Sequence, residues 1–218
     1  MKRVLILVEG LTEERFVKDV LAPHLWNKGK DAIPKVATTK RVKRGPDFKG
    51  GITDYPKVES DLRRLLGDTG AIAVTSFIDY YGLPSDFPGY ATRPAGPPAA
   101  RVSHVEAEWS KKIGHSRFRP FIMLHEFEAL VFVSPSEVCR ALHWAGALPD
   151  LEGIRNAFST PEDINDNPVT APSKRLERLF IGYQKPFHGP LVTKRIGLAA
   201  LRAECPHFHE WVSWLEGL

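Results

Sequence analysis

The sequence predicts an α/β protein: a mostly parallel sheet flanked by helices, with a helical C-terminal extension. Three observations support this prediction. Residues 4–8 and 71–78 are nearly continuous apolar runs rich in β-branched side chains, which is typical of strands buried on both faces. Residues 118–124 form a third such run. The third observation is that helical periodicity follows these runs, because apolar residues recur at helical spacing between positions 11 and 25.

The rest of the first 135 residues alternates in the same way. We expect a second strand over residues 32–39, at an edge of the sheet because of Pro34. Helices are predicted over residues 55–66 and 101–114, and Glu106 and Glu108 are expected to face solvent. Residues 40–51 are predicted to form a basic loop, and residues 83–98 form a second, proline-rich loop.

The remaining third is predicted to be a helical region, 136–218, packed on an α/β core of residues 1–135. Helices are expected over residues 137–145, 154–158 and 193–204, with a helix start at Thr160. Ser173 is expected to cap a helix over residues 174–181, and residues 185–189 to form a loop. The last segment, 205–218, is expected to place its tryptophans in the core.

Composition narrows the classes of protein that fit. The 218 residues contain no apolar run of 18 residues, which argues against a membrane span, and the N-terminal run is too short for a signal peptide. Two cysteines exclude a Cys-rich zinc site and suit a reducing cytoplasm. Residues 28–57 carry nine Lys and Arg against three acids, and residues 174–202 carry seven against one. Such basic segments favour a polyanionic ligand such as nucleic acid.

Acidic residues follow each of the three predicted buried strands. Glu9 ends the first strand with Glu13 four positions later, Asp79 ends the second, and Glu126 and Glu128 follow the third. The carboxyl ends of parallel strands share one rim of a sheet, where α/β proteins bind ligands. Carboxylates at that rim suit Mg²⁺ or Mn²⁺. The alternatives are helix-start chemistry for Glu13 and turn chemistry for Asp79.

Other nucleotide and metal motifs are absent. The turn after residue 8 lacks the second glycine and the lysine of a P-loop and is not Gly-x-Gly-x-x-Gly. Ala129 stands where a His-Glu-x-x-His zinc motif needs histidine. His125 remains open as a ligand, a general base or a hydrogen-bonding residue. Of Glu126 and Glu128, one is expected to serve the site and the other to support it.

Several short motifs resemble the bacterial family called domain of unknown function 4276. The matching pieces are residues 8–13 (Val-Glu-Gly-Leu-Thr-Glu), 79–82 (Asp-Tyr-Tyr-Gly), 125–128 (His-Glu-Phe-Glu), 164–166 (Ile-Asn-Asp), 171–176 (Ala-Pro-Ser-Lys-Arg-Leu) and 188–190 (His-Gly-Pro). The first piece also resembles Toprim-like proteins, including the nuclease domains of the OLD type. This resemblance implies a Toprim-like, Rossmann-like fold.

The Toprim resemblance implies a metal site and a class of activity. Toprim domains hold Mg²⁺ with a glutamate after the first strand and an Asp-x-Asp after a later one, and they act in strand cleavage, topoisomerase and primase chemistry. The likeness assigns these roles to Glu9, Glu13 and Asp79. Tyr81 stands at the second aspartate, so Glu126 or Glu128 is the candidate substitute. Members often work beside an ATPase in anti-phage or genome-maintenance systems, which implies an ATPase partner.

The function expected from the sequence is Mg²⁺-dependent hydrolysis of nucleic-acid phosphodiesters by an effector subunit of a bacterial defence or genome-maintenance system. Lys174 or Lys185 would neutralise charge on the phosphate, and a basic groove over residues 40–49 would follow the backbone. A non-catalytic module that binds a metal or a partner beside an ATPase is the alternative. Phosphoryl or nucleotidyl transfer to a small molecule is a third. The choice of DNA or RNA, single or double strand, the activating signal and the oligomeric state stay open.

Overall fold

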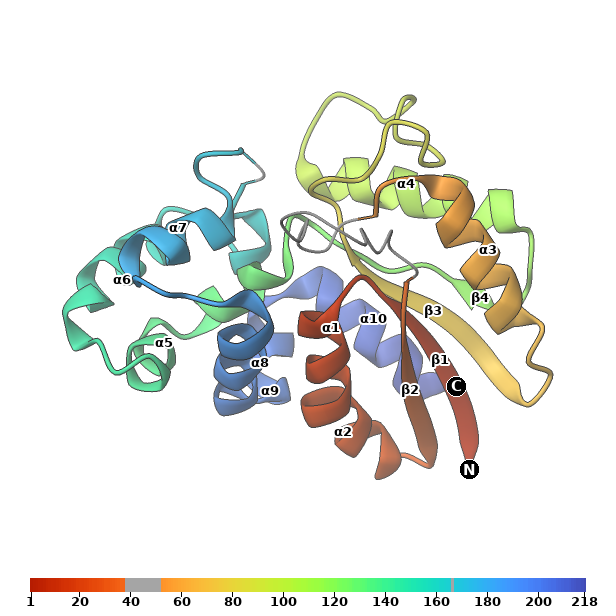
Figure 1. Cartoon of the computed structure of the whole chain (residues 1–218), viewed down its shortest axis with the longest axis horizontal. Coiled ribbons are helices and arrows are strands. Elements are labelled where there is room, and N and C mark those ends of the chain that lie inside the picture. The colour runs from red at the N-terminus through yellow and green to blue at the C-terminus, as the bar shows by residue number, and fades with distance from the viewer. Residues whose placement is uncertain (38–51, 166) are drawn as a thin grey trace, which may run out of the picture.

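The computed structural model describes residues 1–37, 52–165 and 167–218 of the chain. The predicted basic loop over residues 40–51, the groove over residues 40–49 and Asp166 therefore lie outside the described residues. Within those ranges the chain folds as the sequence predicts, into an α/β structure with a parallel sheet flanked by helices (Figure 1).

The sheet has the order β2-β1-β3-β4, and all of its strand pairs in the described residues are parallel. Strand β1 spans Lys2–Val8 and lies between β2 (Lys30–Val36) and β3 (Ala71–Asp79). Pro34 lies in β2, at the edge of the sheet, where its missing N–H costs nothing. The central position of β1 and β3 brings the residues that follow them to the middle of one rim.

The third predicted strand is divided in two. Strands β4 (Phe118–Arg119) and β5 (Ile122–Met123) both pair with β3, and Pro120 lies between them. Proline has no N–H to give to the sheet, so the ladder stops there. Ser76 of β3 bridges the gap, because its hydroxyl accepts the N–H of Phe121 and donates to the carbonyl of Phe121, both at 2.9 Å.

Alternate residues of β1 enter two different cores. Val4, Ile6 and Val8 face one apolar cluster, and Leu5 and Leu7 face the other. Helices α3 (Tyr55–Leu66) and α4 (Pro98–Ile113) cover the second face, and α1 (Leu11–Phe16), α2 (Ala22–Trp26) and α10 (Pro206–Gly217) cover the first (Figure 1). A short π-helix, Val17–Leu21, joins α1 to α2.

The C-terminal third divides between two clusters. Helices α5 (Pro135–Ala141), α6 (Leu148–Asn156), α7 (Pro172–Leu179) and α8 (Lys185–Ile196) build a third apolar cluster with the 3₁₀ helix Phe127–Val133. Short 3₁₀ turns lie at Ala145–Ala147 and Pro161–Asp163. Helices α9 (Leu198–Glu204) and α10 instead pack on the sheet. Trp211 is buried there and donates its indole N–H to Thr75 Oγ1 at 3.0 Å.

Several local predictions are wrong. Residues 185–189 are not a loop, because they begin α8. The predicted helix over residues 193–204 is divided at Gly197, whose φ of 84° ends the helical path. Glu106 does not face solvent, since its carboxylate accepts the N–H of Ile122 at 2.7 Å. None of the helices in the described residues is both long and apolar enough to cross a membrane.

Candidate active site: an acidic cluster at the carboxyl ends of the strands

Glu9 and Asp79 meet where the two central strands end. Val8 of β1 is paired with Phe77 of β3, so the residues that follow lie side by side. The Glu9 carboxylate accepts the backbone N–H of Asp79 at 3.1 Å. The Asp79 carboxylate in turn accepts the backbone N–H of Phe127 at 2.8 Å. Each bond uses one carboxylate oxygen, and together they fix both side chains at the rim.

Glu13 belongs to the same cluster and also supports the turn before α1. Its carboxylate accepts the backbone N–H of Gly10 at 2.9 Å, which satisfies one of the free donors at the helix start. The side chain is buried rather than solvated. Glu13 therefore fulfils the helix-start role and still brings its charge within reach of Glu9.

Glu126 and Glu128 are both buried, but their partners differ. Glu126 accepts the backbone N–H of Ser173 at 2.9 Å and the hydroxyl of Ser173 at 3.0 Å, so it caps the first turn of α7. Both carboxylate oxygens of Glu128 are buried; Oε2 lies 3.2 Å from the ammonium of Lys185, and Oε1 has no hydrogen-bond partner in the described part of the chain. Glu126 is therefore held by Ser173, whereas Glu128 has no such support and keeps Oε1 without a hydrogen bond among the described residues.

Lys185 is the cation of the cluster. It is the first residue of α8, and its ammonium lies 2.9 Å from Glu126 Oε1 and 3.2 Å from Glu128 Oε2. Burial opposes the charge of the ammonium, but the charges of Glu128, Glu126 and Asp79 outweigh burial and raise the pKa of Lys185. Lys185 is therefore protonated at neutral pH.

One ammonium does not balance five carboxylates. Burial, together with the neighbouring carboxylates, raises the pKa of Glu9 to about 7, of Glu13 to about 8 and of Glu128 to about 6. Burial and the charges of Glu9 and Glu13 raise the pKa of Asp79 well above its ordinary value. The cluster therefore holds protons near neutral pH unless it gains positive charge.

The chemistry of the cluster fits a hard divalent cation, whereas its present geometry is not a finished site. Mg²⁺ prefers carboxylate oxygens, and Glu9, Asp79 and Glu128 supply them where negative charge is in excess. Across the described part of the chain, however, no three Asp, Glu, His or Cys side chains are placed to hold a metal ion as they stand. Lys185 pairs with Glu128 instead, so a bound cation would compete with that ammonium.

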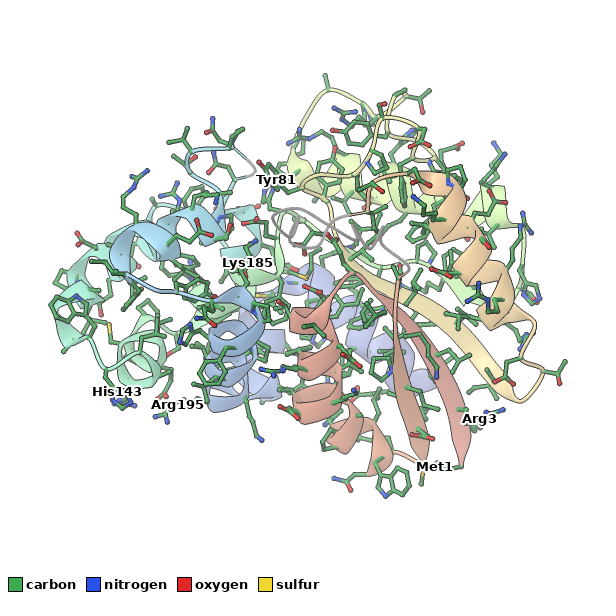
Figure 2. All side chains as sticks on the ribbon, in the orientation of Figure 1. Met1, Arg3, Tyr81, His143, Lys185 and Arg195 are labelled. Atoms are coloured by element: carbon green, nitrogen blue, oxygen red, sulfur yellow. The ribbon has the colours of Figure 1, made fainter. Side chains whose placement is uncertain are left out.

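The remaining predicted site residues are placed differently. Lys174 points to Glu177 of its own helix, with 2.7 Å between ammonium and carboxylate, and it does not join the cluster. His125 is fully buried, and its backbone carbonyl accepts the N–H of Tyr81 at 2.9 Å. Figure 2 shows Tyr81 and Lys185 on the side of the molecule where β1 and β3 end.

Ser173 is a site residue whose role the sequence does not predict. The sequence predicts that Ser173 caps its helix, whereas it lies inside α7 and holds Glu126 through two hydrogen bonds. The Ala-Pro-Ser motif at residues 171–173 is a signal for this role, because Pro172 at the first helical position leaves the next N–H groups free for a carboxylate.

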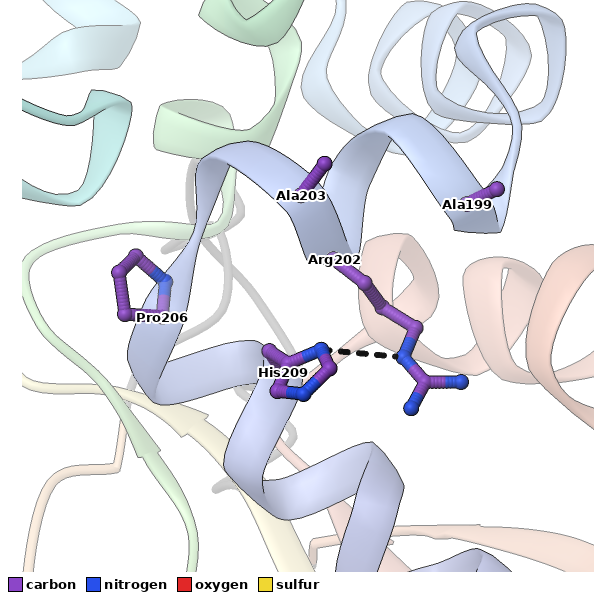
Figure 3. A pocket seen from close by; sticks show the side chains of 5 residues that line it. All are labelled: Ala199, Arg202, Ala203, Pro206 and His209. Atoms are coloured by element: carbon purple, nitrogen blue, oxygen red, sulfur yellow. Dashed lines mark hydrogen bonds between the residues drawn. The ribbon is translucent and has the colours of Figure 1, made fainter.

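A hollow in the surface lies away from this acidic cluster. It has a volume of about 600 Å³ and lies between α9 and α10, lined by Ala199, Arg202, Ala203, Pro206 and His209 (Figure 3). Arg202 is already paired there, with His209 Nδ1 at 3.4 Å and with the Glu216 carboxylate at 2.9 Å. No acid is among its lining residues, so it does not extend the acidic cluster.

Comparison with known proteins gives one match. The model of the protein family described as a domain of unknown function, DUF4276, matches residues 8–216. No curated protein and no solved structure matches the chain. The matched range contains all five carboxylates of the cluster and Lys185.

Proposed function

The chain belongs to the family described as a domain of unknown function, DUF4276, and from its acidic cluster we propose that it is a metal-dependent phosphodiesterase that cleaves nucleic acid. The observation that carries the proposal is the gathering of the Glu9, Asp79 and Glu128 carboxyl groups at the rim where β1 and β3 end, with Lys185 paired to the last of them. Mg²⁺ or Mn²⁺ supplies, when bound, Lewis-acid stabilisation of the phosphate and a water of lowered pKa.

Three carboxylates would hold the metal in this proposal. Glu9 and Asp79 are fixed at the rim by hydrogen bonds that use one oxygen each, and Glu128 has one oxygen, Oε1, without a hydrogen bond among the described residues. Glu128 thereby substitutes for the acid that Tyr81 replaces in the Toprim pattern. Glu13 adds charge beside Glu9, and Glu126 supports the site through Ser173 and Lys185.

Lys185 would act as a cationic donor rather than as a base. Its raised pKa keeps the proton on the ammonium, so it cannot accept one from water at neutral pH. Lys185 would stay hydrogen-bonded to Glu126 and, with Glu128 holding a cation, would have an N–H free to donate to a phosphate oxygen. A charged donor placed in a buried site stabilises negative charge on a transition state more strongly than the same donor in water.

The proposal of a nucleic-acid substrate is based on the net charge of the chain and on the Toprim resemblance. The chain has a net charge of +4. The basic residues of segment 174–202 are partly engaged, since Arg195 pairs with Glu137 and Arg202 with Glu216. An ATPase partner and a place in bacterial defence or genome maintenance are further proposals from the same resemblance.

A non-catalytic metal- or partner-binding module is the second candidate. It is favoured by one observation, namely that Lys185 already occupies the acidic cluster and no three ligands converge in the described residues. Such a module would bind its metal or partner through the charge of the cluster and would cleave no bond.

Charge-removing substitutions separate the two candidates. Purified wild type and the variants Glu9→Gln, Asp79→Asn and Glu108→Gln would be incubated with labelled DNA and RNA in Mg²⁺ or Mn²⁺. Glu108 is a half-exposed acid of α4 that lies outside the cluster. A nuclease loses cleavage in the first two variants and keeps it in the third. Metal-dependent association without cleavage in wild type would contradict the nuclease and favour the module.

A further inference from the structure

Tyr183 lies beside the acidic cluster but has no part in the metal site or in the support of Glu126. It stands two residues before Lys185, in the connection from α7 to α8. Its ring stacks on His188 with 5.4 Å between ring centroids and packs against the third apolar cluster. Its backbone N–H donates to the carbonyl of Phe180 at 3.1 Å. His188 and the third apolar cluster therefore both contact the ring of Tyr183.

The hydroxyl of Tyr183 is buried and has no hydrogen-bond partner among the described residues. Burial, and to a smaller extent the charges of Glu128 and Glu126, raise the pKa of this phenol well above its ordinary value, so the hydroxyl keeps its proton. A buried donor without an acceptor is rare in folded proteins and calls for a missing water, ion or ligand.

At Glu128 it is an acceptor that lacks a hydrogen-bond partner. Glu128 Oε1 is a buried acceptor without a hydrogen-bond donor among the described residues, while the Tyr183 hydroxyl is a donor without an acceptor there. Lys185 is already divided between Glu126 and Glu128. A phosphodiester bound together with a divalent cation would satisfy both groups, since Glu128 would help to hold the cation and a phosphate oxygen would accept from the phenol.

We propose that Tyr183 contacts the substrate, and that its phenol O–H donates a hydrogen bond to a nonbridging oxygen of the phosphate bound beside Glu128. This inference rests on the proposed function and adds a substrate-binding residue to it. The phenol donates without carrying charge, so burial costs it less than it would cost a second ammonium.

The test measures binding rather than cleavage. Fluorescein-labelled single-stranded DNA and RNA of the same sequence are titrated with protein in Ca²⁺, which replaces Mg²⁺ to slow hydrolysis, and anisotropy gives Kd. Tyr183→Phe removes only the hydroxyl and should weaken Kd by about 10-fold, the loss typical of one hydrogen bond to a charged group. Tyr55→Phe is the matched control, since Tyr55 is also buried but belongs to the apolar cluster covered by α3 and α4.

A calorimetric titration of the same variants with Mg²⁺ gives the second readout. Tyr183→Phe should bind Mg²⁺ as wild type does and unfold at the same temperature. Unchanged oligonucleotide binding in Tyr183→Phe would overturn the inference alone. A parallel loss of Mg²⁺ binding would also overturn it, because Tyr183 would then act through Glu128. Failure of the wild type to bind either oligonucleotide would overturn the proposed function and this inference together.

Discussion

Glu126 and Glu128 stand two residues apart, yet only one of them is already satisfied by the protein. Glu126 receives two hydrogen bonds from Ser173 and the ammonium of Lys185, and each stabilises its charge in a buried position. Glu128 has only the ion pair with Lys185. A carboxylate that stays charged without donors raises the free energy of the folded protein unless a ligand arrives.

Neutral substitutions should separate these two roles. Glu126→Gln weakens charge-assisted hydrogen bonds and should lower the free energy of unfolding by about 2 kcal/mol. Glu128→Gln should leave that free energy unchanged or raise it, and should weaken Mg²⁺ binding by at least about 10-fold, since even indirect support of a metal ligand is worth 10–100-fold. Denaturant unfolding and calorimetry measure the two effects. A loss of stability in Glu128→Gln with a loss of Mg²⁺ binding in Glu126→Gln would reverse the two roles.

The raised pKa values predict how the metal-free protein responds to pH. A carboxyl whose pKa is higher in the folded than in the unfolded state stabilises the fold fully below its unfolded pKa, and this contribution is lost as the pH rises through the folded pKa. For Glu13 that window runs from 4.5 to about 8. We expect the unfolding temperature of the metal-free protein to fall across it.

Calorimetric scans with and without Mg²⁺ across that window check this expectation. Glu13→Gln should flatten the fall, because glutamine stays neutral. Mg²⁺ should raise the unfolding temperature most at the alkaline end, where the ligands are deprotonated. A metal-free unfolding temperature that rises with pH over the same window would contradict the electrostatic description of the cluster.

At the scale of elements, α8 carries Lys185 to the cluster, and its close packing depends on Gly189. A Cβ atom at Gly189 would lie 3.0 Å from Phe127 Cε1 and 3.4 Å from Thr12 Cγ2. The helix therefore approaches α1 and the 3₁₀ helix after Glu126 as closely as the backbone allows. That approach sets the distance from Lys185 to both glutamates.

Gly189→Ala should accordingly displace α8. We expect the free energy of unfolding to fall by about 1–2 kcal/mol, as overpacking usually costs, and Mg²⁺ binding to change with it. Gly153→Ala in α6 is the matched control, because nothing lies within 4 Å of its added Cβ. It should stabilise the protein by about 0.5–1 kcal/mol through the ordinary helix preference for alanine. Equal effects of the two changes, measured by denaturant unfolding, would exclude a packing constraint at Gly189.

The start of α8 also shows where prediction from sequence stops. Lys185-Pro-Phe-His-Gly-Pro190 contains two prolines and a glycine, which locally favour a loop. Pro186 suits a first helical turn, and packing against α1 stabilises the rest. The buried strands and helix α3 are predictable because each has a continuous apolar or periodic pattern. The partners of Glu126 and Glu128 cannot be predicted from local sequence. They are Ser173 and Lys185, which lie 47 and 59 positions from Glu126.

At the scale of the whole molecule, the C-terminal helices complete the core of the sheet. Phe208, Trp211 and Leu215 of α10 share an apolar cluster with Val4 and Phe77 of the strands. The sheet would lose part of one covered face without them. The division into residues 1–135 and 136–218, made from the sequence, therefore does not predict two independently stable parts.

Unfolding should be a single transition in consequence. The fluorescence of buried Trp109 and Trp211, which lie on opposite faces of the sheet, should change at the same denaturant concentration as the far-ultraviolet circular dichroism of the helices. Two separated midpoints would show that the C-terminal helices unfold on their own.

The proposed activity depends on a cation site formed by carboxylates from separate strands. The most direct test of that site is calorimetric titration of Mg²⁺ and Mn²⁺ at low salt into wild type, Glu9→Gln and Glu108→Gln. We predict binding to wild type and to Glu108→Gln, and loss of binding in Glu9→Gln. No binding to wild type, or equal binding to Glu9→Gln, would contradict the metal site and the phosphodiesterase proposed from it.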